Sequence, residues 1–114
     1  MDCLSKADIL GADDRRPIRV DVPEWGGVVY VRPLSGVERD ELEAWQAVNK
    51  GGVGLRAKVA SLVLCDAAGA SLEFSEDEVD RLGERSAAAL ARVLNVASEA
   101  SGLGAAAVEE AAKN

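Results

Sequence analysis

The alternating pattern of β-strands occurs in a single region, residues 18–33, and this restricts the folds that are open to the chain. The segment IRVDV, residues 18–22, alternates apolar with charged residues, as a half-buried strand does. The segment VVYVRP, residues 28–33, predicts a second strand that Pro33 closes, because proline cannot donate a ladder hydrogen bond. The link PEWGG, residues 23–27, is typical of a β-hairpin loop. A lone hairpin is marginally stable, so this one must pack against the rest of the chain.

Helical patterns occupy the remainder of the sequence. Ser35 and Glu38 have the spacing of a capping box, in which each side chain binds an otherwise unpaired backbone N–H group, and Ser75 and Glu78 repeat it. We expect helices over residues 36–50, 55–65 and 76–83, and over SAAALARVLNVASEASGL from residue 86 until Gly102 and Gly104 end it. A short helical turn after Ser5, with Asp8 at its third position and Gly11 as its stop, precedes the hairpin.

Apolar residues recur at helical spacing in two of these segments. In the helix expected over 55–65 they form one stripe, made of Leu55, Val59, Leu62 and Val63. In the helix that begins near residue 86 they define a face made of Ala87, Leu90, Val93, Leu94 and Ala97.

These elements predict an α+β fold with an N-terminal β-hairpin packed on a mainly helical bundle of four to five helices. We expect a single domain over residues 1–114, because a chain of this length can bury one modest core. Its expected parts are an N-terminal turn and connector over 1–17, the hairpin over 18–33, the bundle over 35–102 and a weak C-terminal helix over 103–114.

The composition limits the classes of partner. The net charge of −7 repels phosphate groups, which argues against binding to nucleic acid or to an anionic membrane surface. Two cysteines, Cys3 and Cys65, are too few for a disulfide framework, and the first residues lack the pattern of a signal peptide. We therefore expect an acidic protein of the cytoplasm.

Catalytic chemistry finds little support in the sequence. The chain contains no histidine, the commonest general base near neutral pH and the commonest metal ligand. The acidic cluster Glu76, Asp77, Glu78 and Asp80 fits a solvated helix start better than a magnesium site, because the helix dipole favours carboxylates there. The glycine-rich GGVG, residues 51–54, lacks the Lys-Ser/Thr of a phosphate-binding loop and is interpreted as a helix stop and linker. We expect no enzyme activity, no metal and no cofactor.

Partner binding is the remaining class of function. Trp25 can either cover the hairpin's own core or anchor a partner, and Trp45 fits a core position on its helix or a contact surface. The alanine-rich end suits close packing of helices, either within a bundle or against a partner's helix. The candidate partner-binding residues are Trp25, Trp45, Leu103 and Val108.

Three segments together resemble the tail assembly chaperones of long-tailed (siphophage-type) bacteriophages. They are LSKADILGADD, VPEWGGVVYVRPLSGVERDELE, and FSEDEVDRLGERSAAALARVLNVASEASGL with the closing VEEAAKN. The features that carry the resemblance are the PEWGG loop, the Leu-Ser-Gly-x-Glu-Arg helix start and the Leu-Gly-x-x-Ser-x-x-x-Leu step, in this order.

The resemblance implies a non-enzymatic role in virion morphogenesis. Such a chaperone acts in the host cytoplasm, binds the long helical tape measure protein, and keeps it soluble until tail tube subunits polymerise around it. The resemblance also implies two further possible partners, the major tail tube protein and other copies of the chaperone itself.

Two other functions stay open from the sequence. A structural head–tail completion or tail-terminator subunit would share the small size and would persist in the virion. An acidic inhibitor or DNA mimic of a host enzyme would need carboxylates spaced like DNA phosphates, and no such regular spacing is seen.

Overall fold

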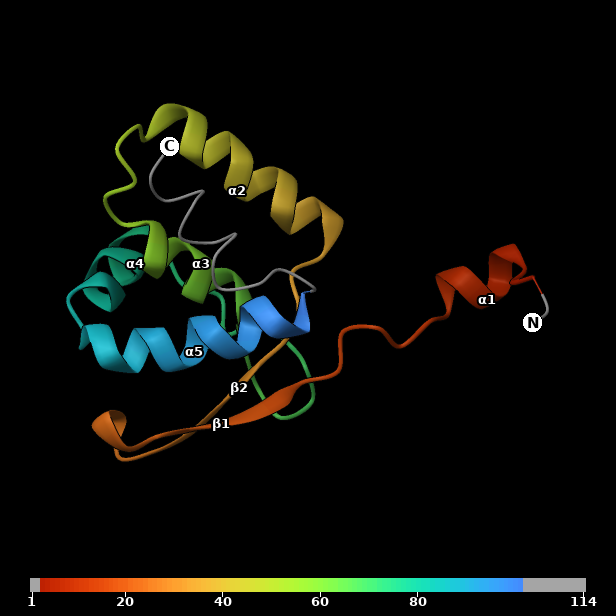
Figure 1. Cartoon of the computed structure of the whole chain (residues 1–114), viewed down its shortest axis with the longest axis horizontal. Helices are drawn as coiled ribbons and strands as arrows, with labels where there is room; N and C mark the ends of the chain where they lie inside the picture. The colour runs from red at the N-terminus through yellow and green to blue at the C-terminus, as the bar shows by residue number, and fades with distance from the viewer. Residues whose placement is uncertain (1–2, 102–114) are drawn as a thin grey trace.

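The computed structural model describes residues 3–101, so the helix predicted over 103–114 lies outside the described residues. Its helices are α1 (Lys6–Leu10), α2 (Gly36–Val48), α3 (Leu55–Val63), α4 (Glu76–Gly83) and α5 (Ala87–Ala100) (Figure 1). Its strands are β1 (Ile18–Val22), β2 (Gly27–Val31) and β3 (Leu64–Cys65), with the 3₁₀ helix η1 (Pro23–Trp25) between β1 and β2. The predicted α+β class, with an N-terminal hairpin and mainly helical remainder, is confirmed.

The sheet contains a third strand that the sequence analysis assigned to a helix. The three strands are antiparallel in the order β1-β2-β3, and Tyr30 and Val31 of β2 pair with Cys65 and Leu64 of β3. The helix expected over 55–65 therefore ends at Val63, whose carbonyl accepts a hydrogen bond from the Arg32 N–H at 3.0 Å. In a short segment whose residues are all apolar and buried, the hydrophobic pattern has no period, so it cannot distinguish a helix from a strand. Leu64 and Cys65 form a strand because they pair with β2.

The hairpin is confirmed, with a loop one residue tighter than expected. Val22 pairs with Gly27, so the loop is Pro23–Gly26 instead of Pro23–Gly27. Gly26 has a φ of 76°, a left-handed conformation that glycine adopts without steric cost, and it turns the chain from η1 into β2. β2 ends at Val31, just before Arg32 and the predicted closing residue Pro33.

Serine caps start three of the helices as the sequence predicts. The hydroxyl of Ser35 accepts a hydrogen bond from the Glu38 N–H at 3.1 Å, and the Glu38 carboxylate accepts one from the Ser35 N–H at 3.0 Å. The same reciprocal pair forms at α1 and at α4, on the residues that the sequence analysis names. α2 ends at Val48 with Asn49 as its cap, two residues earlier than expected.

The core lies between the hairpin and the helices. In Figure 1 the hairpin lies below α5, with α3 and α4 above α5 and α2 at the top. α5 contacts both strands of the hairpin as well as α3, and α3 contacts α2 and α4 in addition. The most completely buried large side chains are Val22, Val31, Val63 and Val93. Aliphatic residues fill this core because the sequence has few aromatic ones.

The buried face of α5 begins later than predicted. Ala87 is exposed at the first position of the helix, and Ala89 and Ser98 join Leu90, Val93, Leu94 and Ala97 on the buried face. The cause is the entry of the chain into α5. Its first turn lies at the surface near Gly83 and Arg85, so burial begins only where α5 meets α3 and the hairpin.

α1 stands apart from the rest of the molecule. Figure 1 shows it at one end of the longest axis, joined to β1 by an extended connector, and none of its residues is buried. The bundle itself therefore consists of α2, α3, α4 and α5 in the part of the chain that the structure describes.

Candidate functional site

Trp25 packs against the molecule's own core. It is partly buried at the end of η1, and η1 contacts α5. Beside it, the Nε of Arg92 on α5 donates a hydrogen bond to the Glu24 carboxylate at 2.9 Å. This hydrogen bond holds the pKa of Glu24 below its ordinary value. The tip of the hairpin is thus attached to α5 by one aromatic side chain and one ion pair.

Trp45 also packs against the core, at a different place. It is partly buried on α2, and its ring lies under the loop that joins α2 to α3, where an added Cβ on Gly54 would meet a ring carbon at 3.7 Å. Figure 1 shows α2 and η1 on opposite sides of α5. The structure therefore does not bring the two tryptophans into one surface. The other two candidates, Leu103 and Val108, lie outside the described residues.

Glu38 is the centre of a cluster that the sequence analysis missed. Its carboxylate forms ion pairs with Arg15 of the connector and, at 2.9 Å, with Arg32, which follows β2. Arg15 also donates to the Pro33 carbonyl at 3.0 Å, and Arg32 donates to the Gly69 carbonyl at 2.8 Å. Three regions distant in sequence, near residues 15, 32–38 and 69, are joined here. Because the Arg32 and Glu38 side chains are only 13% and 17% exposed, we interpret this cluster as structural.

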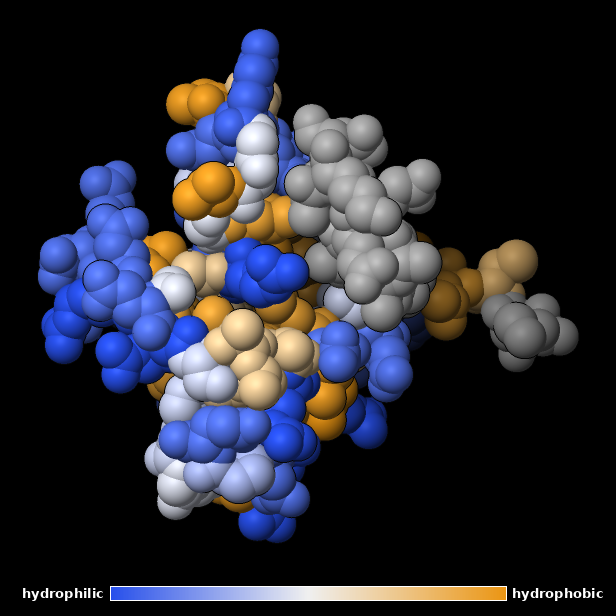
Figure 2. Space-filling model, turned by 60° about the vertical axis from the view of Figure 1, so that its left-hand side comes forward, coloured by the Kyte–Doolittle hydropathy of each residue, from blue (hydrophilic) through white to orange (hydrophobic). Residues whose placement is uncertain are grey.

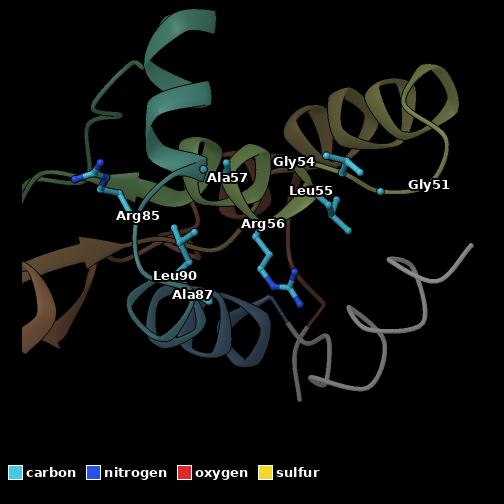
Figure 3. Close-up of a pocket in the computed structure, with 11 residues that line it drawn as sticks. Gly51, Gly54, Leu55, Arg56, Ala57, Arg85, Ala87 and Leu90 are labelled. Atoms are coloured by element: carbon cyan, nitrogen blue, oxygen red, sulfur yellow. The ribbon is translucent and has the colours of Figure 1, made fainter.

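A surface hollow of about 790 Å³ lies where the α2–α3 loop meets the turn between α4 and α5. This hollow is lined by Gly51, Gly52, Val53, Gly54, Leu55, Arg56, Ala57, Gly83, Arg85, Ala87 and Leu90 (Figure 3). Its size falls in the range of roughly 300–1,000 Å³ that is usual for binding pockets. Figure 2 shows hydrophobic surface gathered in a recess between hydrophilic projections on the face that carries α4 and the start of α5.

The charge of the hollow is opposite to that of the whole molecule. Arg56 and Arg85 line it, and neither forms a salt bridge with any residue between 3 and 101. Leu90 and Ala57 lie between the two arginines in the view of Figure 3. The hollow therefore combines an apolar floor with two cationic side chains. GGVG, residues 51–54, is interpreted from the sequence as a helix stop and linker, and the one signal that could have found the site is Arg56, two residues after Gly54.

A second exposed apolar surface lies on α1 and the residue before its cap. The side chains of Leu4, Ile9 and Leu10 are 69%, 59% and 80% exposed. A helix of this length gains little from its own hydrogen bonds, because most helical stability in proteins comes from packing an apolar face. Within the described part of the chain nothing covers this face.

The described residues hold no cluster of metal-ligating side chains. At the start of α4, hydrogen bonds from Ser75 lower the pKa of Glu78, as a capping carboxylate requires. Burial raises the pKa of the Cys65 thiol, which disfavours its nucleophilic thiolate form, whereas Cys3 is exposed. No described helix is long and apolar enough to cross a membrane.

No protein-family model and no curated protein matches the chain. A solved structure does, that of the tail assembly chaperone of bacteriophage HK97. The two share 26% sequence identity with a TM-score of 0.58, over 82% of this chain and 89% of the phage protein. The match supports a role in tail assembly and a non-enzymatic protein. It confirms the resemblance to bacteriophage tail assembly chaperones that the sequence indicates.

Proposed function

We propose that this protein is a bacteriophage tail assembly chaperone that binds the tape measure protein and keeps it soluble during tail tube assembly. The observation that carries the proposal is the likeness to the HK97 tail assembly chaperone over most of both chains. The protein acts in the host cytoplasm, without catalysis. The major tail tube protein and further copies of the chaperone are the other partners that this role allows.

The surface of the molecule suits such a role physically. A chaperone for a long helical client needs apolar surface that is free before the client binds, and α1 and the hollow supply it. It also needs charge elsewhere, so that neither the free protein nor the complex aggregates. The net charge of −7 supplies that repulsion.

The test is co-expression with the tape measure protein of the same phage genome, followed by size-exclusion chromatography with light scattering. We expect the client to become soluble only together with this protein. The two should co-elute, and the measured mass gives the number of copies per client and reveals any homo-oligomer in the free protein.

A different result would identify the alternative function. If the client stays insoluble and mass spectrometry finds this protein in purified virions, the protein is a structural head–tail completion or tail-terminator subunit. In that case the chaperone proposal is wrong.

A further inference from the structure

Arg56 occupies a position where its charge does not stabilise the fold. It is the second residue of α3, and a helix start carries partial positive charge that favours carboxylates. α1, α2 and α4 each place an acidic residue at their third position under a serine cap. α3 has neither an acidic residue in its first turn nor a side-chain cap. The helix dipole and Arg56 together therefore give this side of the hollow a positive potential.

Arg85 supplies the second positive charge. It follows the end of α4, and it forms no salt bridge with another described residue although Glu84 is its neighbour in the sequence. Other arginines of the described part, such as Arg15, Arg32 and Arg92, have carboxylate partners. Among residues 3–101 the two arginines of the hollow thus have no carboxylate partner, as pairing with a partner's carboxylates requires.

The shape of the hollow fits a helix. Its apolar floor lies between the two arginines, so an occupant would place apolar side chains in the middle and negative charges on either side (Figure 3). One wall is made of glycines, which have no side chains to obstruct an occupant. Val53, which is 88% exposed, adds apolar surface at the rim. An amphipathic helix that lies in a groove makes this kind of contact. A nucleic acid would be repelled by the net charge of −7.

We infer that the hollow binds a helix of the client whose apolar residues are flanked by Asp or Glu, with Arg56 and Arg85 pairing with those carboxylates. This inference depends on the proposed function and names the surface and the chemistry by which it is carried out. The arginines select the segment of the client, and the apolar floor supplies most of the buried area.

The test is client capture by the double variant R56E/R85E, in the co-expression experiment described above. The matched control is R19E/R39E, which reverses two exposed arginines outside the hollow that form salt bridges with Asp21 and Glu43. We expect roughly a tenfold weaker complex for R56E/R85E and wild-type binding for the control. The variant should fold normally, because a glutamate in the first turn of α3 suits the helix dipole.

Two synthetic amphipathic helices give a readout that a folding defect cannot imitate. They share one Leu/Ala stripe, flanked by Glu in the first and by Lys in the second. The wild type should prefer the Glu peptide and R56E/R85E the Lys peptide, with the preference falling as salt rises. An unchanged preference in the variant would overturn the inference.

The outcomes separate this inference from the proposed function. If the wild type does not solubilise the client, the proposed function fails. If wild type and R56E/R85E solubilise it equally, only the inference about the hollow fails. If R56E/R85E changes the mass of the free protein and leaves client capture intact, the hollow is an interface between copies and the client inference is wrong.

Discussion

Two residues illustrate how the hairpin is held to the helices. Trp25 contributes packing area at the tip, and Glu38 contributes charge at the base, where it joins Arg15 and Arg32. The indole Nε1 of Trp25 and the Nε of Arg32 are buried without a hydrogen-bond partner among the described residues. A buried donor without a partner raises the free energy of the folded state. Packing and the ion pairs nearby must therefore contribute more stabilisation than this cost at both places.

Trp25→Ala should lower the free energy of unfolding by about 2 kcal/mol, because the side chain is only partly buried and a fully buried one would cost more. Trp25→Phe is the control and should retain most of the stability, since it keeps a ring and removes the unpaired N–H. Thermal unfolding followed by circular dichroism checks both. If Phe is as harmful as Ala, packing is not the role of this residue. If Ala changes neither the melting temperature nor client binding, Trp25 does not hold the hairpin in a functional position.

Glu38→Gln should cost about 2–3 kcal/mol, because it leaves two arginines without their shared carboxylate while Gln can still cap α2. Glu43→Gln is the matched control. It breaks an exposed pair with Arg39 and should cost less than about 1 kcal/mol. Urea unfolding of the two variants measures the difference, and equal costs would contradict a structural role for the Glu38 cluster.

At the level of elements, the sequence predicts what depends on neighbouring residues and misses what depends on distant ones. The serine caps fixed the starts of α1, α2 and α4 because each cap acts within three residues. β3 exists only because β2 offers an edge more than thirty residues earlier in the chain, so no local pattern announces it. The Arg15–Glu38 pair and the hollow are likewise assembled by the fold. Their parts are visible in the sequence, but their proximity is not.

α1 gives a prediction at this scale. Replacing Leu4, Ile9 and Leu10 by Ser should leave the melting temperature unchanged, because none of them is buried, and should reduce the yield of soluble client. Val37→Ser/Val48→Ser is the control, since it removes exposed apolar side chains from α2 instead. A clear loss of stability in the α1 variant would show that α1 packs on the body of the protein and is not a free contact surface.

At the scale of the whole molecule, the two apolar surfaces are far apart. The loop and turn that line the hollow lie at the left of Figure 1, and α1 lies at the opposite end of the longest axis, which measures 47 Å. One copy can therefore use both surfaces at once, without competition between their occupants. The net charge of −7 discourages contacts other than those that the apolar surfaces form.

The unequal burial of the two cysteines has a practical consequence. Cys65 is enclosed in β3 and its thiol resists ionisation, whereas Cys3 is exposed next to α1. A maleimide dye will therefore label the wild-type chain at Cys3 first and place its fluorophore beside α1. The natural sequence thus carries its own attachment point for following, in real time, when α1 meets a partner.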